Sequence, residues 1–408
     1  MDKKLNKFYL NHKKNISAAY IWISGGSYLD KIDQKGINQI LCSLLTRGSK
    51  TLDNYQISKI LDDNGAELYY ETLEDGIYLG IKSLKEYFMN VYPLLEIILY
   101  ESNIPESEFK KCKHSQINYI LKNKENLFLK TFDNWKKIVY KEHPYRYDCN
   151  GYIDTINNIK YEEIEKEYNK LRQRNMYLLS NHEISNLEDI NLQTILKVHK
   201  KENINDSLNF KKEARYIESN FNTHQIVIML GNRTCPHNNA DYLALKLLES
   251  YLAYGMSSIL FKMFREKNGL TYDIGIIHPV RKEYAPFLIY LAVSNERAIL
   301  AFKILKNIWH EFLTKLIPNE ELDLAKTKLK NSLLHSNQHL EDILLRKVQL
   351  ISYQMDHDFD MISFEKIQQI SPELINKVAN KYLKNPFLSI LGDSKVCKDI
   401  REFWELDF

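Results

Sequence analysis

The sequence lacks an excess of either charge and any organised pattern of cysteines. Lys+Arg number 56 and Asp+Glu number 53, which leaves a formal net charge of +3 spread along the chain. This balance argues against nucleic-acid binding, which needs a basic stripe interleaved with aromatic residues. The five cysteines are odd in number, far apart and without a Cys-x-x-Cys pair. This spacing argues against both a disulfide framework and a structural zinc site.

Long apolar runs are missing as well. The longest, such as FLIYLAV at 287–293, have the length of a strand and cannot span a bilayer. The opening MDKKLNKFYLNHKKN is basic but has no apolar segment of a signal peptide. We therefore expect a cytoplasmic protein that neither spans nor binds a membrane. What is present is an ordinary globular composition, 44% hydrophobic and 27% charged, in 408 residues, which by length suggests two or three domains.

The chain contains an internal repeat. IPESEFKKCKHSQINYIL (104–121) matches IPNEELDLAKTKLKNSLL (317–334), and each begins with Ile-Pro and carries glutamate in its first turn. Proline and acidic residues both suit the start of a helix. A second pair, 156–180 and 367–391, reads in both copies as an apolar-periodic helix that runs into a short strand. One such match is a chance result for amphipathic helices, but matches in the same order indicate duplication.

A third pair completes the repeat and predicts the domains. AYIWISGG (19–26) and IVIMLGN (226–232) read as equivalent strands, each followed by a buried helix. We expect an α+β fold with two homologous domains at 1–190 and 216–408. Each should hold an antiparallel-rich sheet packed with helices on one face. The polar segment 191–215 lacks core periodicity and is the expected linker.

The order of these pieces, with several motifs, resembles the pitrilysin/insulinase family of inverzincin zinc peptidases. Within that family, the sequence is similar to the short-chain type, which includes mitochondrial processing peptidase and its bacterial relatives. The resemblance covers roughly 15–395 and rests on ISGGSYLD (23–30), NGAELYYETLEDGIYLGI (64–81), HPYRYDCNGYIDTI (143–156) and YGMSSILFKMFREKNGLTYDIG (254–275). The last of these is the most specific.

The sequence departs from the family at the catalytic motif. Members that hydrolyse peptides carry His-x-x-Glu-His on a helix in the first half, where the histidines bind zinc and the glutamate is the general base. The corresponding helix here reads GINQILCSLLTRGS (36–49), with Gln39, Cys42 and Ser43 at the three positions. An amide is a poor zinc ligand, and neither a thiol nor a hydroxyl can act as that base.

The third zinc ligand of the family, a glutamate on a later helix, is also missing. It should fall near Asn118 or Tyr119, and no residue between Lys110 and Lys124 is acidic. The resemblance therefore predicts that this chain binds no metal or other cofactor.

Three other groups are candidate sites. His335 and His339 stand four apart in HSNQH, which is a ligand spacing on a helix, but no carboxylate follows in the family register. Two surface histidines are the simpler interpretation. His143 belongs to HPY, where loop packing is expected rather than chemistry. Cys42 is a nucleophile only in principle, because its neighbours predict a small buried hydrophobe.

In this family the second half supplies an arginine and a tyrosine that bind the substrate backbone and the developing oxyanion. The resemblance assigns these roles to Arg265 and Tyr272, and a substrate loop to Gly255, Ser257 and Ser258. Arginine offers a planar fork of donors and tyrosine a phenolic donor, which suits both roles. The alternative is that Arg265 caps its own helix and Tyr272 is a sheet aromatic.

A chain without the zinc motif but with the Arg265 and Tyr272 pair resembles the non-catalytic subunit of a heterodimeric peptidase. Its partner would be a homologue that bears His-x-x-Glu-His and holds the zinc, with the peptide paired along a sheet edge. The first alternative is a catalytically inactive scaffold or peptide-binding protein of the same fold. The second is a self-sufficient enzyme that uses a different site. Retention of Arg265 and Tyr272 favours the heterodimer.

Overall fold

The computed structural model describes residues 5–11, 15–184, 188–189, 215–271, 273–336 and 338–407. The chain forms two compact units. Unit 1 consists of Met1–Asn123, Tyr147–Lys201 and Ser336–Phe359, and unit 2 of Lys124–Arg146, Glu202–His335 and Asp360–Phe408.

These units are not the two halves of the sequence. Unit 1 takes 336–359 from the second half, and unit 2 takes 124–146 from the first half. The ranges 1–190 and 216–408 therefore describe the repeat but not the compact units. Except for Arg215, the linker expected at 191–215 lies outside the described residues.

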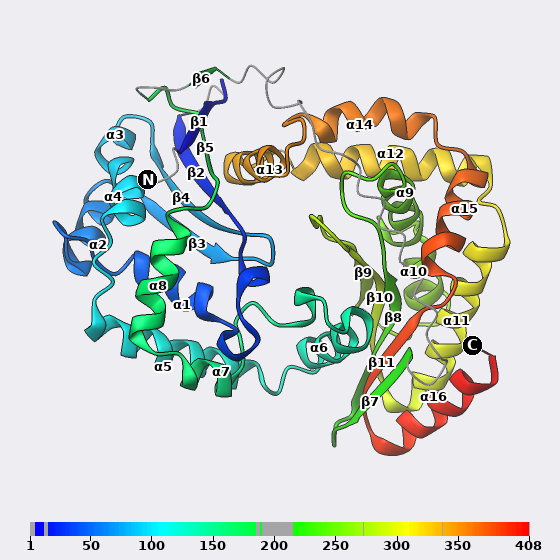
Figure 1. The fold of residues 1–408 in the computed structure, drawn as a ribbon. Helices are drawn as coiled ribbons and strands as arrows, with labels where there is room; N and C mark the ends of the chain where they lie inside the picture. The colour runs from blue at the N-terminus through cyan, green and yellow to red at the C-terminus, as the bar shows by residue number, and fades with distance from the viewer. Residues whose placement is uncertain are drawn as a thin grey trace. The chain divides into compact units, whose positions relative to one another are not determined.

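Unit 1 is built on a six-stranded sheet with the order β3-β4-β2-β5-β1-β6 (Figure 1). The antiparallel neighbours are β3 with β4, β4 with β2 and β2 with β5, whereas β1 runs parallel to β5 and β6. The strands are β1 (Asn6–Tyr9), β2 (Ile16–Ser24), β3 (Glu67–Thr72), β4 (Gly76–Leu84), β5 (Met176–Ser180) and β6 (Glu188–Asp189).

The central strand β2 is buried on both faces, which a sheet covered by helices on both sides requires. Alternate residues Ala19, Ile21 and Ile23 join the larger core, which includes residues of α1 (Ile37–Leu45), α4 (Pro93–Tyr100) and α8 (Tyr161–Leu171). On the other face, Ala18, Tyr20 and Trp22 pack with Leu340, Leu344, Val348 and Ile351 of α13 (Leu340–Ser352). The expected helical layer is thus present, and α13 adds cover on the second face.

Unit 2 repeats this topology. Its sheet has the order β7-β11-β8-β10-β9, and its strands pair in the same directions as β1-β5-β2-β4-β3. The strands are β7 (Tyr216–Asn220), β8 (Gln225–Arg233), β9 (Asp273–Ile277), β10 (Pro286–Ser294) and β11 (Phe387–Gly392). Helix α6 (Leu127–Tyr140) packs on β8 and β11, and the Ser389 hydroxyl donates a hydrogen bond to the Thr131 carbonyl at 2.9 Å. Figure 1 shows α11 (Ala298–Thr314) and α15 (Pro372–Leu383) on the side of this sheet away from α6.

The helices confirm the duplication. The Ile-Pro repeats form α5 (Glu106–Asn123) and α12 (Asn319–Ser336), which are followed by α6 and α13. The second repeat forms α8 with β5 and α15 with β11. The remaining helices are α2 (Asn54–Asp63), α3 (Phe88–Val91), α7 (Ile153–Asn158), α9 (Tyr242–Ala253), α10 (Ile259–Phe261), α14 (Phe359–Gln368) and α16 (Ser394–Asp407). The predicted α+β fold with two homologous domains is confirmed.

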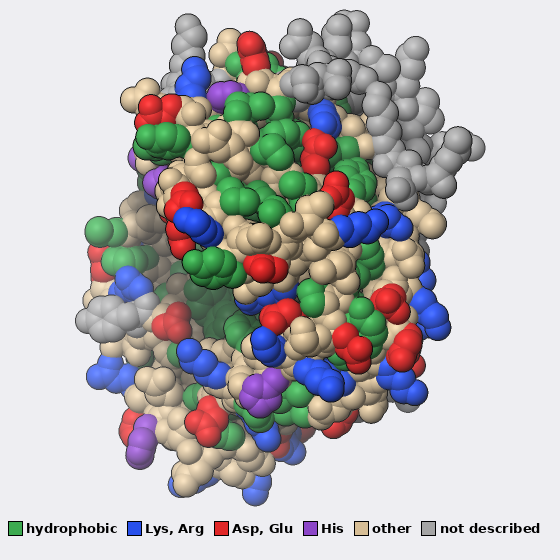
Figure 2. Space-filling model, turned by 90° about the vertical axis from the view of Figure 1, so that its left-hand side faces the viewer, with side chains coloured by type: hydrophobic (Ala, Val, Ile, Leu, Met, Phe, Trp, Pro, Cys, Tyr) green, Lys and Arg blue, Asp and Glu red, His purple; other side chains and the backbone are tan. Residues whose placement is uncertain are grey.

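Charge and hydropathy agree with the composition. Figure 2 shows acidic and basic side chains interspersed on one face, with no large patch of one sign among the residues coloured there. Within the described part of the chain, no helix combines the length and apolarity needed to cross a bilayer.

Candidate functional site

Helix α1, which holds the three residues predicted to replace the zinc motif, begins at a tightly packed turn. Gly36 is its N-cap with φ of 94°, and a Cβ there would lie 2.7 Å from the Asn150 carbonyl oxygen and 2.5 Å from Cδ1 of Ile156. The buried Asp30 carboxylate accepts the Gly36 N–H at 2.9 Å and the Asn38 amide. Burial raises the pKa of Asp30 to about 6, although these two hydrogen bonds oppose the shift. Backbone contacts therefore fix where α1 starts.

Two of the three motif side chains are engaged in local hydrogen bonds. The Gln39 side-chain oxygen accepts the backbone N–H of Thr72 at 3.3 Å, which ties α1 to the end of the edge strand β3. The Ser43 hydroxyl donates to the Gln39 carbonyl at 3.1 Å, one turn back along the helix. Neither side chain is arranged as a metal ligand.

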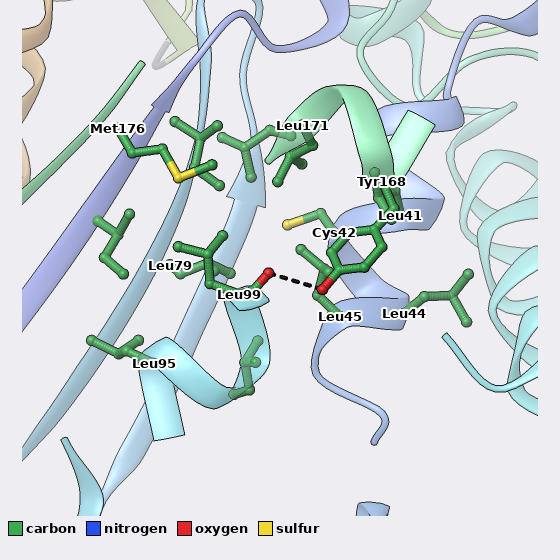
Figure 3. Packing of buried hydrophobic residues seen from close by; sticks show 14 of the residues in the cluster. Leu41, Cys42, Leu44, Leu45, Leu79, Leu95, Leu99, Tyr168, Leu171 and Met176 are labelled. Atoms are coloured by element: carbon green, nitrogen blue, oxygen red, sulfur yellow. Dashed lines mark hydrogen bonds between the residues drawn. The ribbon is translucent and has the colours of Figure 1, made fainter. Parts of the chain in front are cut away.

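Cys42 faces the core of unit 1. Figure 3 shows its sulfur among Leu79, Leu171 and Met176, and the residue is fully buried. Burial raises the pKa of the Cys42 thiol to about 12, so the thiol is neutral near pH 7. The interpretation of Cys42 as a small buried hydrophobe agrees with this environment, whereas a nucleophile needs a lowered pKa and access.

The expected position of the third zinc ligand offers no carboxylate. Asn118 and Tyr119 lie exposed on α5, while the buried side of the helix carries Phe109, Cys112 and Gln116. The Gln116 amide donates to the Asn150 carbonyl at 3.0 Å. The donor set of α1 and α5 therefore does not fit the catalytic zinc of the family.

The histidines considered as other sites have simple structural roles. His335 lies in the last turn of α12 and His339 is the N-cap of α13, so the expected placement of both on one helix is wrong, and both are exposed, as surface histidines are. The break follows from the helix end at Ser336. His143 lies 2.7 Å from a carboxylate oxygen of Glu283, with its ring 4.5 Å from that of Tyr145, in agreement with loop packing.

One cluster of potential metal ligands was not anticipated. Among the described residues, Asp356, His357 and Asp358 bring ligand atoms within 4.8 Å of one another. The Lys347 ammonium already donates to Asp358, so a cation of the chain itself is paired with one of the two carboxylates. The DHD run in the sequence was the available signal.

In unit 2 the predicted substrate loop follows α9. Gly255 has φ of 76° and is exposed together with Met256 and Ser257. Ser258 is buried and caps α10, where its hydroxyl oxygen accepts the Phe261 N–H at 3.4 Å. The structure therefore places all three predicted loop residues at one turn, with only Ser258 committed to a helix cap.

Arg265 stands in a π-helical turn, η6 (Lys262–Glu266), which continues α10. The Lys267 N–H donates to the Lys262 carbonyl at 2.9 Å, five residues back, which is the pairing of a π-helix. Such turns are uncommon and frequently occur at functional sites. The half-buried Arg265 guanidinium lies 5.0 Å from the centre of the Phe261 ring.

The chain then turns from helix to strand. Gly269 has φ of 54°, and its N–H donates to the Arg265 carbonyl at 3.1 Å. The Thr271 hydroxyl donates to the Ala292 carbonyl and accepts the Asp273 N–H at 3.0 Å, at the start of β9. Tyr272 lies between these two residues but outside the described residues. Its assigned role stays a prediction.

Tyr290 on β10 is a neighbour of this turn that the sequence did not reveal. It pairs with Gly275 of β9, where a Cβ would lie 2.8 Å from the Tyr290 hydroxyl. Burial and Asp273 raise the pKa of Tyr290, while Arg265 lowers it, so both charges lie near the phenol. The Tyr290 phenol therefore lies over Gly275 of β9, close enough to Arg265 to feel its charge.

Comparison with known proteins agrees with these features. "Insulinase (Peptidase family M16)" matches residues 8–149, and "Peptidase M16 inactive domain" matches residues 162–329. An "Uncharacterized zinc protease" of Rickettsia felis is 26% identical over 76% of each chain. The "Non-peptidase homolog YmxG" of Helicobacter pylori is 21% identical over 90% of this chain and 86% of its own.

A solved structure shares the whole fold. The peptidase M16 inactive domain from Pseudomonas fluorescens superposes with a TM-score of 0.79 at 16% identity, over 95% of each chain. The two matched domains and the repeated topology agree on one assignment. The chain belongs to peptidase family M16, and its sequence contains no His-x-x-Glu-His.

Proposed function

We propose that this chain is the non-catalytic, substrate-binding subunit of a heterodimeric M16 zinc peptidase. One contrast within the chain carries the proposal. The sequence has no His-x-x-Glu-His and no carboxylate at the expected third-ligand position, whereas unit 2 holds the full Arg-Glu-Lys-x-Gly-Leu-x-Tyr string from Arg265 to Tyr272. An oxyanion donor acts where a carbonyl oxygen gains negative charge during a reaction.

The partner is a homologue with an intact His-x-x-Glu-His helix, which supplies the zinc and the general base. This chain supplies the Arg265 guanidinium to peptide carbonyls and the Tyr272 phenol to the oxygen that gains charge. The exposed turn at Gly255 and Ser257 offers backbone groups to the peptide. An extended peptide also adds to a sheet edge by main-chain hydrogen bonds.

A second candidate is a catalytically inactive peptide-binding scaffold of the same fold. The hydrogen bonds of Gln39 and Ser43 within unit 1 favour it, because they give both side chains a structural role and leave neither for catalysis. The two functions differ in whether Arg265 and Tyr272 affect turnover or only peptide affinity.

Isolation of the tagged chain from its native host tests the proposal. We expect a chain of similar size with an intact His-x-x-Glu-His to copurify, carrying about one zinc per heterodimer. The heterodimer should cleave peptide. The tagged chain alone should not, and neither should the heterodimer after its zinc has been removed. A homodimer as the sole species, or chelator-sensitive cleavage by the isolated chain, would contradict the proposal.

A further inference from the structure

Helix α9 buries a charged cluster that the proposed function does not use. Glu249 is 6% exposed, and its carboxylate accepts three hydrogen bonds. Lys246 donates to Oε2 at 2.8 Å, His278 Nδ1 lies 3.1 Å from Oε2, and the Tyr254 hydroxyl donates to Oε1 at 3.0 Å. The sequence signal was a lysine and a glutamate three residues apart in the otherwise apolar YLALKLLESYLA.

The charges of this cluster are fixed by its surroundings. Burial raises the pKa of Glu249, but Lys246 and His278 outweigh it and hold that pKa below its ordinary value. Burial lowers the pKa of His278, which is therefore a neutral ring that donates its Nδ1 proton. A buried carboxylate is stable only when paired and hydrogen-bonded, and Glu249 has three donors that meet this need.

Water has little access to the cluster. The His278 ring lies 5.4 Å from that of Tyr242 and 5.2 Å from that of Phe287, and both aromatic residues are buried. In such an environment each hydrogen bond to the carboxylate is stronger than at the surface. Loss of a single donor to the Glu249 carboxylate should therefore destabilise the segment that carries this donor.

The positions of two donors in the chain are informative. Tyr254 directly precedes Gly255 of the substrate loop, and His278 directly follows β9. The segment 254–278 lies between them and contains the turn η6, Arg265 and Tyr272. Both ends of the peptide-binding segment are thus hydrogen-bonded to the same carboxylate.

We propose that Glu249 is the positioning residue of segment 254–278, and this inference rests on the proposed function for its effect on peptide cleavage. Glu249 does not touch the peptide. It holds Tyr254 and His278 in place, so that the loop, η6 and the start of β9 present Arg265 in one orientation. A cluster that served stability alone would affect the whole unit and not this segment in particular.

A conservative substitution with a matched control tests the inference. Tyr254→Phe removes only the hydroxyl that donates to Glu249. Tyr251→Phe makes the same change on the same helix, where the Tyr251 hydroxyl donates to Glu321 at 2.9 Å. Glu249→Gln preserves volume and removes the charge, as a second variant at the centre of the cluster.

The first readout is amide hydrogen exchange of the isolated, full-length chain, followed by mass spectrometry. We expect peptides within 255–271 to exchange about tenfold faster in Tyr254→Phe, the effect of one lost hydrogen bond to a charged group. Peptides from α11 should be unchanged, and Tyr251→Phe should match the wild type throughout. Unchanged exchange in 255–271, or equal acceleration in α11, would overturn the inference whatever the activity.

The second readout is steady-state cleavage by the reconstituted heterodimer. We expect Tyr254→Phe to raise KM about tenfold with a smaller change in kcat, because Arg265 binds the ground-state backbone. Faster exchange with wild-type KM would overturn the positioning role. Absence of cleavage by the wild-type pair would count against the proposed function instead, and the exchange result alone would then decide whether Glu249 anchors the segment.

Discussion

At the scale of single residues, Gln39, Cys42 and Ser43 have each found a partner within unit 1. The amide binds β3, the hydroxyl binds its own helix, and the thiol joins the core. A zinc site needs ligands that point at one open position, with neighbouring groups that hydrogen-bond to these ligands and orient them. These three side chains are instead satisfied as parts of a packed helix.

Cys42 gives a direct check of this packing. Because burial raises its pKa to about 12, the thiolate is scarce at pH 8.5 and the sulfur is also out of reach of solvent. We expect iodoacetamide to leave Cys42 unmodified in the native chain and to modify it fully after denaturation in urea, as read by peptide mass spectrometry. Rapid native labelling of Cys42 would show that α1 is open to solvent.

Asp30 should make stability depend on pH near the start of α1. Its folded pKa of about 6 lies above the ordinary 3.8, so the folded state binds the proton more tightly. Protonated Asp30 therefore contributes to the free energy of unfolding. The contribution is fully present below about pH 4 and is lost as the pH rises through 6. The loss amounts to about 3 kcal/mol for a shift of about two pKa units.

Asp30→Asn removes that titration. The free energy of unfolding of the variant, relative to wild type, should therefore rise between pH 4.5 and pH 7, measured by urea denaturation at each pH. The comparison between the two pH values matters, because the substitution also changes the hydrogen bonds to Gly36 and Asn38. A difference that is constant with pH would contradict a raised pKa for Asp30.

At the scale of elements, the start of α1 depends on one left-handed glycine. Gly36→Ala should destabilise unit 1 for two reasons. The new Cβ would clash with the Asn150 carbonyl and Ile156, and a φ of 94° strains the backbone of any residue other than glycine. Gly65→Ala is the matched control, since Gly65 has φ of 53° and nothing within 4 Å of a Cβ. The strain common to both is about 1–2 kcal/mol.

We expect the free energy of unfolding to fall further for Gly36→Ala than for Gly65→Ala, by at least about 1 kcal/mol. Chemical denaturation followed by circular dichroism measures both. Equal losses for the two variants would mean that the turn before α1 is less closely packed against Asn150 and Ile156 than the structure shows.

The helix-to-strand turn near Arg265 shows what could be predicted and what could not. The apolar positions Ile259, Leu260 and Phe264 and the glycine at 269 are visible in the sequence, and the structure has a helical turn that ends before Gly269 and a strand, β9, that begins at Asp273. The widening to a π-helix was not predictable, because one extra residue in a turn leaves no mark in a short apolar pattern. Glu249 was overlooked because its partners Tyr254 and His278 meet it only in the folded chain.

At the scale of the whole molecule, the repeat predicted the duplication, but not which helices each unit holds. The apolar sides of α6 and α13 show that each helix is buried, yet they do not show which sheet covers it. The structure assigns α6 to unit 2 and α13 to unit 1. In each unit, one face of the sheet is therefore covered by a helix from the other half of the sequence. Sequence periodicity reports burial and leaves the partner open.

The assignment of α13 predicts how fragments behave. A chain that ends at residue 335 lacks α13, which exposes the face of β2 that holds Ala18, Tyr20 and Trp22, and it also lacks β11 of the unit 2 sheet. Burial of a large apolar side chain contributes about 1.5–3 kcal/mol, so the loss should leave unit 1 unfolded or aggregated. Solubility and thermal unfolding of this fragment measure the effect.

A rescue in the same cells gives the control. Coexpression of a second fragment that begins at residue 336 should restore soluble protein, because it supplies α13 to unit 1 and β11 to unit 2. A fragment ending at residue 335 that is soluble and as stable as the full chain would show that α13 is not part of the core of unit 1.

The central claim is that this chain binds peptide for a catalytic partner through Arg265 and Tyr272. The most direct measurement is steady-state cleavage by the reconstituted heterodimer with the double variant Arg265→Ala, Tyr272→Phe, alongside size-exclusion chromatography and zinc analysis. Loss of the phenolic donor should lower kcat by about 10²–10³. Loss of the guanidinium should also raise KM, since its bonds form to the ground-state backbone. The account predicts this loss with assembly and the partner's zinc unchanged, whereas wild-type turnover by the double variant would contradict it.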